Sequence, residues 1–126
     1  LGIFPEGSSA YAVLRPPRGG AAFMAARSGA PILPVGLDGF TEVFPSLKRG
    51  RRARVTVRIG EPFGPFAPPG RGRERRERVA EIGDEIMRRI AGLISPERRG
   101  HYSDDPAIRA AAQGTEYFPW DDEPEG

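Results

Sequence analysis

The sequence contains no cysteine, a single histidine and a single lysine in 126 residues. Without cysteine, a disulfide framework and any zinc site with thiolate ligands are excluded. No run approaches the ~18 apolar residues that a membrane-spanning helix requires. The apolar and charged fractions, 38% and 29%, are ordinary for globular proteins and predict one modest domain. Nothing in the composition calls for a metal or an organic cofactor, and none is expected.

Charge is distributed unevenly along the chain. Residues 1–99 carry 18 basic and 10 acidic side chains, whereas residues 100–126 carry one basic and seven acidic side chains. A basic body favours anionic partners, which include phospholipid headgroups, coenzyme A phosphates, an acidic carrier protein and nucleic acid. We therefore expect a folded body over residues 1–99. The acidic tail, residues 100–126, is expected to be either flexible or docked through its aromatic side chains.

The first half of the chain predicts a strand, a helix and a second strand. Residues 1–4 form a short apolar run before a proline, and prolines and glycine then exclude a helix until about residue 20. A helix is expected over residues 20–28, ended by Gly29 in a left-handed cap. Residues 32–37 are apolar enough for a second buried strand. This order predicts a right-handed crossover with parallel strands that end at one rim.

The second half predicts one exposed strand and one long helix. Residues 54–59 alternate between apolar and polar side chains, as in a strand at a sheet edge. Residues 73–94 carry an apolar stripe at helical spacing, with both signs of charge on the other face, so we expect this helix to pack on the sheet and not to lie on a membrane. The predicted fold class is α/β, with a partial parallel or mixed sheet and flanking helices.

Glu6 is the first candidate site residue. It follows the apolar run directly and lies between Pro5 and Gly7. Open α/β sheets bind ligands beyond the carboxyl ends of their strands, which is the predicted position of Glu6. Gly7 permits a positive φ, and its amide together with those of Ser8 and Ser9 can form an anion-binding nest. From these residues alone, a carboxylate that caps a loop and a plain tight turn remain open alternatives.

Two segments resemble the glycerolipid acyltransferase family, of the 1-acylglycerol-3-phosphate O-acyltransferase kind. The segment Phe4-Pro5-Glu6-Gly7 matches the start of that family's Phe-Pro-Glu-Gly-Thr-Arg-Ser block, and Ser8 keeps the hydroxyl type. The following helix contains the Ala-Arg-x-x-x-Pro pattern, and Pro34 matches the proline of the family's next block. The resemblance covers about the first forty residues and only the carboxyl-terminal half of the family's domain.

The resemblance implies an activity and a set of roles. Such an enzyme transfers a fatty acyl group from acyl-CoA or acyl carrier protein to the hydroxyl of a lysophospholipid such as 1-acylglycerol-3-phosphate, in phospholipid biosynthesis. It implies substrate binding by Phe4, Pro5, Glu6, Gly7, Ser8 and Pro34. It also implies that Glu6 supports the catalytic histidine. The implied partners are a lysophospholipid, an acyl donor and a membrane surface, at the cytoplasmic side of a bacterial cell membrane, with no nucleic acid.

The chain departs from the family at two places. The family attributes acyl transfer to an upstream His-x-x-x-x-Asp pair, but five residues after the only histidine, His101, stands Pro106. We therefore expect the chain to be a fragment whose parent carries the pair upstream, and to be inactive alone. Ser9 replaces the family's arginine, which removes a cation from the expected phosphate site. Arg15 and Arg18 are the candidate replacements, although each also fits a solvated loop residue.

Two other functions stay open at this point. A non-catalytic domain of this fold would bind an anionic lipid or a partner without turnover. A nucleic-acid-binding module would use the basic residues between Lys48 and Arg58 as a phosphate-tracking patch. The second is disfavoured because no aromatic residues are interleaved with these cations.

Overall fold

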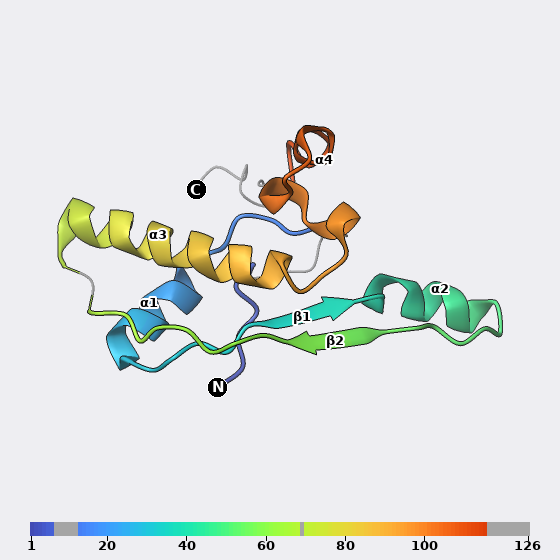
Figure 1. Ribbon diagram of the computed structural model, residues 1–126, viewed down its shortest axis with the longest axis horizontal. Coiled ribbons are helices and arrows are strands. Elements are labelled where there is room, and N and C mark those ends of the chain that lie inside the picture. Colours follow the sequence, from blue (N-terminus) through green and yellow to red (C-terminus); the bar gives the residue numbers. More distant parts are fainter. Residues whose placement is uncertain (7–12, 69, 116–126) are drawn as a thin grey trace, which may run out of the picture.

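The computed structural model describes residues 1–6, 13–68 and 70–115. These residues form an α/β structure with four α-helices and one two-stranded antiparallel sheet. The long helix α3, Gly72–Ala91, runs along the body, with α1 on one side and the carboxyl-terminal elements on another (Figure 1). The α/β class predicted from the sequence is confirmed.

Helix α1, Gly19–Ser28, begins and ends close to where the sequence predicts. Gly29 adopts a left-handed conformation with φ of 66°, and its N–H donates to the carbonyl of Ala25 at 3.1 Å. Arg27 lies in the last turn, where the helix dipole favours a cation. The small residues Ala22 and Ala26 are buried, so this helix can approach α3 closely.

Helix α3 organises the hydrophobic core on two sides. Ile82 and Ile86 pack with α1 and with Phe63, while Met87 and Ala91 form a second cluster with neighbouring apolar residues. The predicted stripe therefore faces the interior, as the helical spacing indicated. The ion pair between Glu85 and Arg89, at 2.9 Å, borders the first cluster, because the Arg89 guanidinium lies 4.7 Å from the centroid of the Phe63 ring.

The sheet consists of β1, Val35–Asp38, and β2, Thr56–Ile59. Their register pairs Val35 with Ile59 and Asp38 with Thr56. A Cβ atom added at Gly36 would lie 2.6 Å from the Cβ of Leu93, so this face of the sheet is pressed against the chain that follows α3. The opposite face, which presents Val35, Leu37, Val57 and Ile59, is exposed.

Two predictions about the sheet are wrong for the described residues. Residues 1–4 form no strand, and Phe4 is 78% exposed. An apolar run becomes a strand only where another strand satisfies its backbone groups, and no described segment pairs with this one. The predicted parallel crossover is also absent, because β1 pairs antiparallel with β2. The predicted strand 32–37 begins only at Val35, since Ile32 forms an isolated bridge with Phe63.

Short helices lie between the two strands and after α3. The 3-10 helix η1, Phe40–Glu42, and helix α2, Val43–Lys48, connect the two strands. After α3 come η2, Pro96–Arg98, η3, Gly100–Tyr102, and α4, Pro106–Ala111. The amide of Leu14 donates to the carbonyl of Arg98 at 2.9 Å, which ties this end to the body. In the first part of the acidic tail, Gly100, Ser103 and Ala112 are buried. None of the helices described is long and apolar enough to cross a membrane.

Candidate functional site

Glu6 is held by the backbone of the following loop. The amide of Arg15 donates to Glu6 Oε2 at 3.2 Å, and the amide of Arg18 donates to the carbonyl of Pro5 at 2.8 Å. Burial raises the pKa of the Glu6 carboxyl above its ordinary value, while the Arg15 amide and the Arg15 charge act in the opposite direction. The residue implied to be functional is therefore a partly buried carboxylate in a defined position.

Arg15, a candidate for the missing phosphate cation, belongs to the interior. It is 1% exposed, and its Nε donates to the carbonyl of Thr115 at 2.6 Å. Thr115 also contacts His101, with 3.0 Å between Oγ1 and Nε2. A guanidinium used in this way joins the loop that holds Glu6 to the carboxyl-terminal segment, so its role is structural in the first place.

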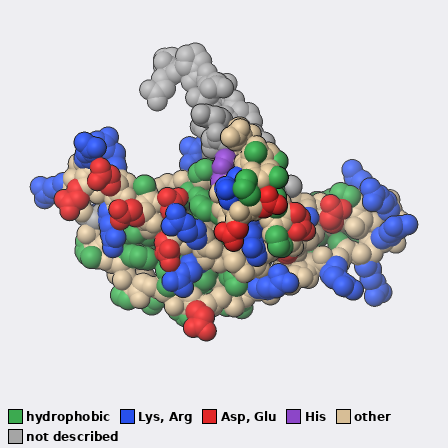
Figure 2. Space-filling model, turned by 45° about the horizontal axis from the view of Figure 1, so that its top comes forward, with side chains coloured by type: hydrophobic (Ala, Val, Ile, Leu, Met, Phe, Trp, Pro, Cys, Tyr) green, Lys and Arg blue, Asp and Glu red, His purple; other side chains and the backbone are tan. Residues whose placement is uncertain are grey.

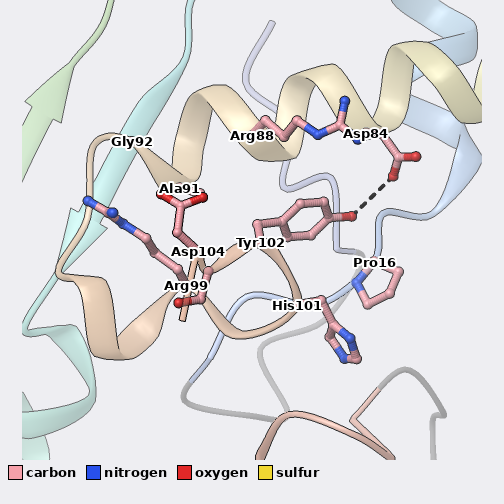
Figure 3. Close-up of a pocket in the computed structure, with 10 residues that line it drawn as sticks. Pro16, Asp84, Arg88, Ala91, Gly92, Arg99, His101, Tyr102 and Asp104 are labelled. Carbon is pink, nitrogen blue, oxygen red and sulfur yellow. Dashed lines mark hydrogen bonds between the residues drawn. The ribbon is translucent and has the colours of Figure 1, made fainter. Parts of the chain in front are cut away.

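A cleft of about 580 Å³ opens between the end of α3 and the η3 segment (Figure 3). Asp84 and Arg88 reach it from α3, Arg99 precedes η3, and His101 and Tyr102 lie within η3. The lining is completed by the small or short side chains of Pro16, Ala91, Gly92, Ser103 and Asp104. The cleft has the size of a small-molecule site and a mainly polar lining.

The Tyr102 hydroxyl lies at the centre of this lining and donates to Asp84 Oδ1 at 3.3 Å (Figure 3). Burial raises the pKa of the Tyr102 phenol well above its ordinary value, and the negative charge and hydrogen bond of Asp84 raise it further. The charge of Glu6 acts on Tyr102 in the same direction. Tyr102 therefore stays a neutral hydrogen-bond donor at physiological pH. Glu6 itself is not among the residues that line the cleft.

The cleft also holds cations. Arg88 is exposed on its wall, and Arg99 donates from one terminal nitrogen to the carbonyl of Ile94 at 3.3 Å. The Nε atom of Arg99 is buried and has no hydrogen-bond partner among the residues that the structure describes. The lining of the cleft thus includes two arginines, a phenol and a carboxylate, and the arginines can bind a polar anionic molecule through charge-assisted hydrogen bonds. No group of potential metal ligands occurs in the described segments.

The structure brings together only part of the predicted site. Pro5 and Glu6 lie beside the loop that carries Arg15, whereas Phe4 points its side chain into solvent. Gly7, Ser8 and Ser9 lie outside the described residues. Arg18 is exposed and lines a different cleft, of about 530 Å³, with Phe23 and Arg75 of the two main helices.

Pro34 packs next to the sheet, directly before β1. It is buried, and its carbonyl accepts a hydrogen bond from the amide of Gly60 at 2.9 Å. A Cβ atom added at Gly60 would lie 2.9 Å from Pro34 Cγ, so the two residues are in close contact next to the sheet. This placement is the one expected for a proline that leads into a strand, where its missing N–H costs nothing.

Sequence reasoning missed most of the residues that line the cleft. Asp84 and Arg88 read as members of the charged face of α3, and Tyr102 follows the lone histidine without any motif. Their one available signal was spacing, because Asp84, Arg88 and the buried Ala91 lie three and four residues apart on one side of the helix. Only the folding of η3 against that side brings Tyr102 to them.

Comparison of the chain with protein-family models, with curated proteins and with solved structures finds no match in any of the three.

Proposed function

We propose that this chain is the acceptor-binding part of a glycerolipid acyltransferase, whose parent protein transfers a fatty acyl group to a lysophospholipid hydroxyl. The finer fold assignment, a fragment of the glycerolipid acyltransferase fold, is part of the same proposal. The observation that carries it is the position of Glu6 within the Phe4-Pro5-Glu6-Gly7 motif. Its carboxylate is partly buried and fixed by the Arg15 amide. Its negative charge also acts on Tyr102, which lines a cleft with two arginines.

The chemistry assigns separate tasks to these groups. The acceptor hydroxyl attacks the thioester carbonyl, a C–O bond forms, the C–S bond breaks, and the hydroxyl proton passes through a base to the departing thiolate. Glu6 accepts a hydrogen bond from the glycerol portion of the acceptor or from the base. Arg88 and Arg99 meet the acceptor's phosphate. The base itself, the histidine of a His-x-x-x-x-Asp pair, is expected from elsewhere in the parent chain, so the present residues alone are expected to bind and not to turn over.

Calorimetric titration of this chain with a short-chain 1-acylglycerol-3-phosphate, below its micelle concentration, tests the binding part. We expect saturable binding that falls only modestly between roughly 50 and 200 mM salt, a range over which a surface that tracks a polyanion loses orders of magnitude in affinity. Glu6→Gln should weaken binding about tenfold, in line with the loss of one charged hydrogen bond. The matched control is Glu61→Gln, which changes an exposed carboxylate.

The catalytic part is tested on the parent gene product. The reading frame that encodes this chain should contain His-x-x-x-x-Asp within roughly one hundred residues upstream of Leu1, a distance set by ordinary domain size. That protein should acylate 1-acylglycerol-3-phosphate, and Glu6→Gln should raise the KM for the acceptor more than it lowers kcat. A parent protein without the pair, or one whose turnover is indifferent to Glu6→Gln, would contradict the proposal.

A further inference from the structure

The segment between the two strands forms an arm that projects from the body (Figure 1). We call residues 39–55 the basic arm; it contains η1, α2 and the return to β2. Its conformation is fixed by its own backbone. The amide of Arg51 donates to the carbonyl of Ser46 at 2.8 Å, and Gly39, at φ of 84°, lies so close to the carbonyl of Arg54 that no other residue fits there. The arm therefore has a defined backbone conformation.

One face of the basic arm is apolar and uncovered. Phe40, Phe44 and Leu47 are spaced four and three residues apart, so they follow one side of η1 and α2. Their exposed fractions are 46%, 75% and 63%. A stripe of this kind normally packs against a protein core, but none of these three side chains belongs to either hydrophobic cluster.

Cations surround this apolar face. The basic arm carries one acidic side chain, Glu42, and five basic ones: Lys48, Arg49, Arg51, Arg52 and Arg54. All five basic side chains are exposed, and none forms an ion pair with a described residue. Figure 2 shows Lys and Arg side chains gathered at the end of the molecule that α2 forms. This positive charge is therefore not neutralised within the described part of the fold.

We propose that the basic arm docks onto the surface of an anionic lipid bilayer. Phe44 and Leu47 enter the boundary between headgroups and acyl chains, and the five basic side chains meet the lipid phosphates. Charge selects this occupant over a contact between the basic arms of two copies of the chain, since the two arms would repel each other. The exposed stripe selects a bilayer over nucleic acid, because an apolar face gains nothing from phosphates alone.

This inference does not depend on acyl transfer. Binding is measured on vesicles that contain neither lysophospholipid nor acyl donor, and Glu6→Gln is expected to leave it unchanged. A failed acyltransferase assay and a failed vesicle assay are therefore separate results.

Vesicle flotation with the whole chain tests the charge requirement. We expect binding to phosphatidylcholine vesicles that contain about 30% phosphatidylglycerol, and little binding to phosphatidylcholine alone. Arg51→Gln with Arg52→Gln should weaken the affinity about 25-fold, at roughly fivefold for each cation near the surface. Arg71→Gln with Arg76→Gln, which removes the same charge at the start of α3, is the matched control and should have much less effect. An equal loss in both variants would show that net charge, and not the arm, governs binding.

The apolar requirement is tested on the same vesicles. Phe44→Ser with Leu47→Ser should weaken binding about tenfold or more. Both side chains are exposed, so the fold should be retained, as circular dichroism can verify. The control Leu33→Ser changes an exposed leucine outside the arm. If polyuridine or duplex DNA binds as tightly as anionic vesicles and the double serine variant leaves that binding intact, the arm is a nucleic-acid surface and the proposal is overturned.

Insertion can be observed directly because the chain has no cysteine of its own. Leu47→Cys carrying the environment-sensitive dye NBD should brighten and shift to the blue on anionic vesicles, whereas Leu33→Cys with the same dye should not. An unchanged spectrum at position 47 in the presence of bound vesicles would also overturn the proposal.

Discussion

The pKa of Tyr102 depends on the residues around it. Its hydroxyl donates to Asp84, and burial together with that carboxylate keeps the phenol protonated above its ordinary pKa. A phenol whose folded-state pKa is raised contributes stability below the unfolded pKa of about 10, and this contribution is lost as the pH rises beyond that value. Tyr102 therefore links alkaline unfolding to the cleft.

We expect Tyr102 to ionise at higher pH than an ordinary tyrosine. The chain has three tyrosines, so titration followed at 295 nm should show about a third of the amplitude delayed to higher pH in the folded protein. In denaturant the delay should vanish. Tyr102→Phe should remove the delayed step and lower the free energy of unfolding by about 1 kcal/mol, the usual worth of one hydrogen bond. A single step in the folded protein would show that Tyr102 does not meet Asp84.

Asp38 gives the opposite pH dependence. The Ser95 hydroxyl lowers the pKa of this carboxyl below its ordinary value, helped by the Ser95 amide at 2.9 Å and by the charge of Arg98, whose Nε lies 3.3 Å away. A carboxyl with a lowered folded-state pKa stabilises the fold above its ordinary pKa, and the effect is lost as the pH falls through the folded value. Asp38 thus fastens β1 to the chain after α3 near neutral pH.

We expect Asp38→Asn to lower the free energy of unfolding by about 1–2 kcal/mol at pH 7 and by less below pH ~4, where the carboxyl of the unfolded chain begins to protonate. Urea unfolding at the two pH values measures this difference. Glu61→Gln, which alters an exposed carboxylate, should change neither value. An equal loss at both pH values would attribute the effect to shape and not to charge.

At the scale of elements, the contact between α1 and α3 depends on a glycine. A Cβ atom at Gly83 would lie 2.9 Å from Pro17 Cγ and 4.0 Å from Ala22 Cβ. Gly83→Ala should therefore destabilise the protein by about 1–2 kcal/mol, even though alanine is the better helix former. Gly92→Ala is the matched control, because its nearest neighbour would be 3.6 Å away, and it should be neutral or slightly stabilising. Thermal unfolding of both variants checks this prediction. Equal unfolding midpoints would show that Pro17 shifts to accommodate the added methyl group at little cost.

The two longest helices, α1 and α3, and the location of β2 were predictable from the sequence, whereas α2, α4 and the strand pairing were not. Local signals set α1 and α3: the glycine cap at Gly29 and the apolar stripe through Ile82 and Ile86 act within a few residues. Strand pairing depends on a partner that is distant in sequence. Residues 1–4 are predicted to form a strand, but no described segment pairs with them. A parallel partner is predicted for β1, whereas β1 pairs antiparallel with β2.

The candidate site was likewise only partly predictable from the sequence. Glu6 could be singled out because its neighbours form a motif, and the structure fixes it through the Arg15 amide. The role of Arg15 itself could not be predicted, since its contact with Thr115 spans 100 positions of the sequence. Asp84 and Tyr102 became candidates only once η3 was placed beside α3.

On the scale of the whole molecule, most large exposed apolar side chains of the described residues lie in three places: the basic arm, one face of the sheet and residues 1–4. Because β1 and β2 pair Val35 with Ile59 and Leu37 with Val57, these four side chains share one face. All four are exposed, Ile59 at 67%. The other face is closed by Leu93 against Gly36. A contiguous apolar area of this kind differs from the scattered apolar residues of ordinary surfaces.

The exposed sheet face should bind a hydrophobic dye in the native state. We expect the fluorescence of anilinonaphthalene sulfonate to rise with the folded protein, and Leu37→Thr with Ile59→Thr to reduce that rise clearly, since threonine keeps the strand preference but removes apolar area. Met24→Gln, a change at an isolated exposed side chain of α1, should leave the fluorescence nearly unchanged. If the threonine variant binds as much dye as the original protein while Phe44→Ser with Leu47→Ser binds less, the basic arm and not the sheet provides the accessible apolar surface. In that case Val35, Leu37, Val57 and Ile59 must be covered in solution.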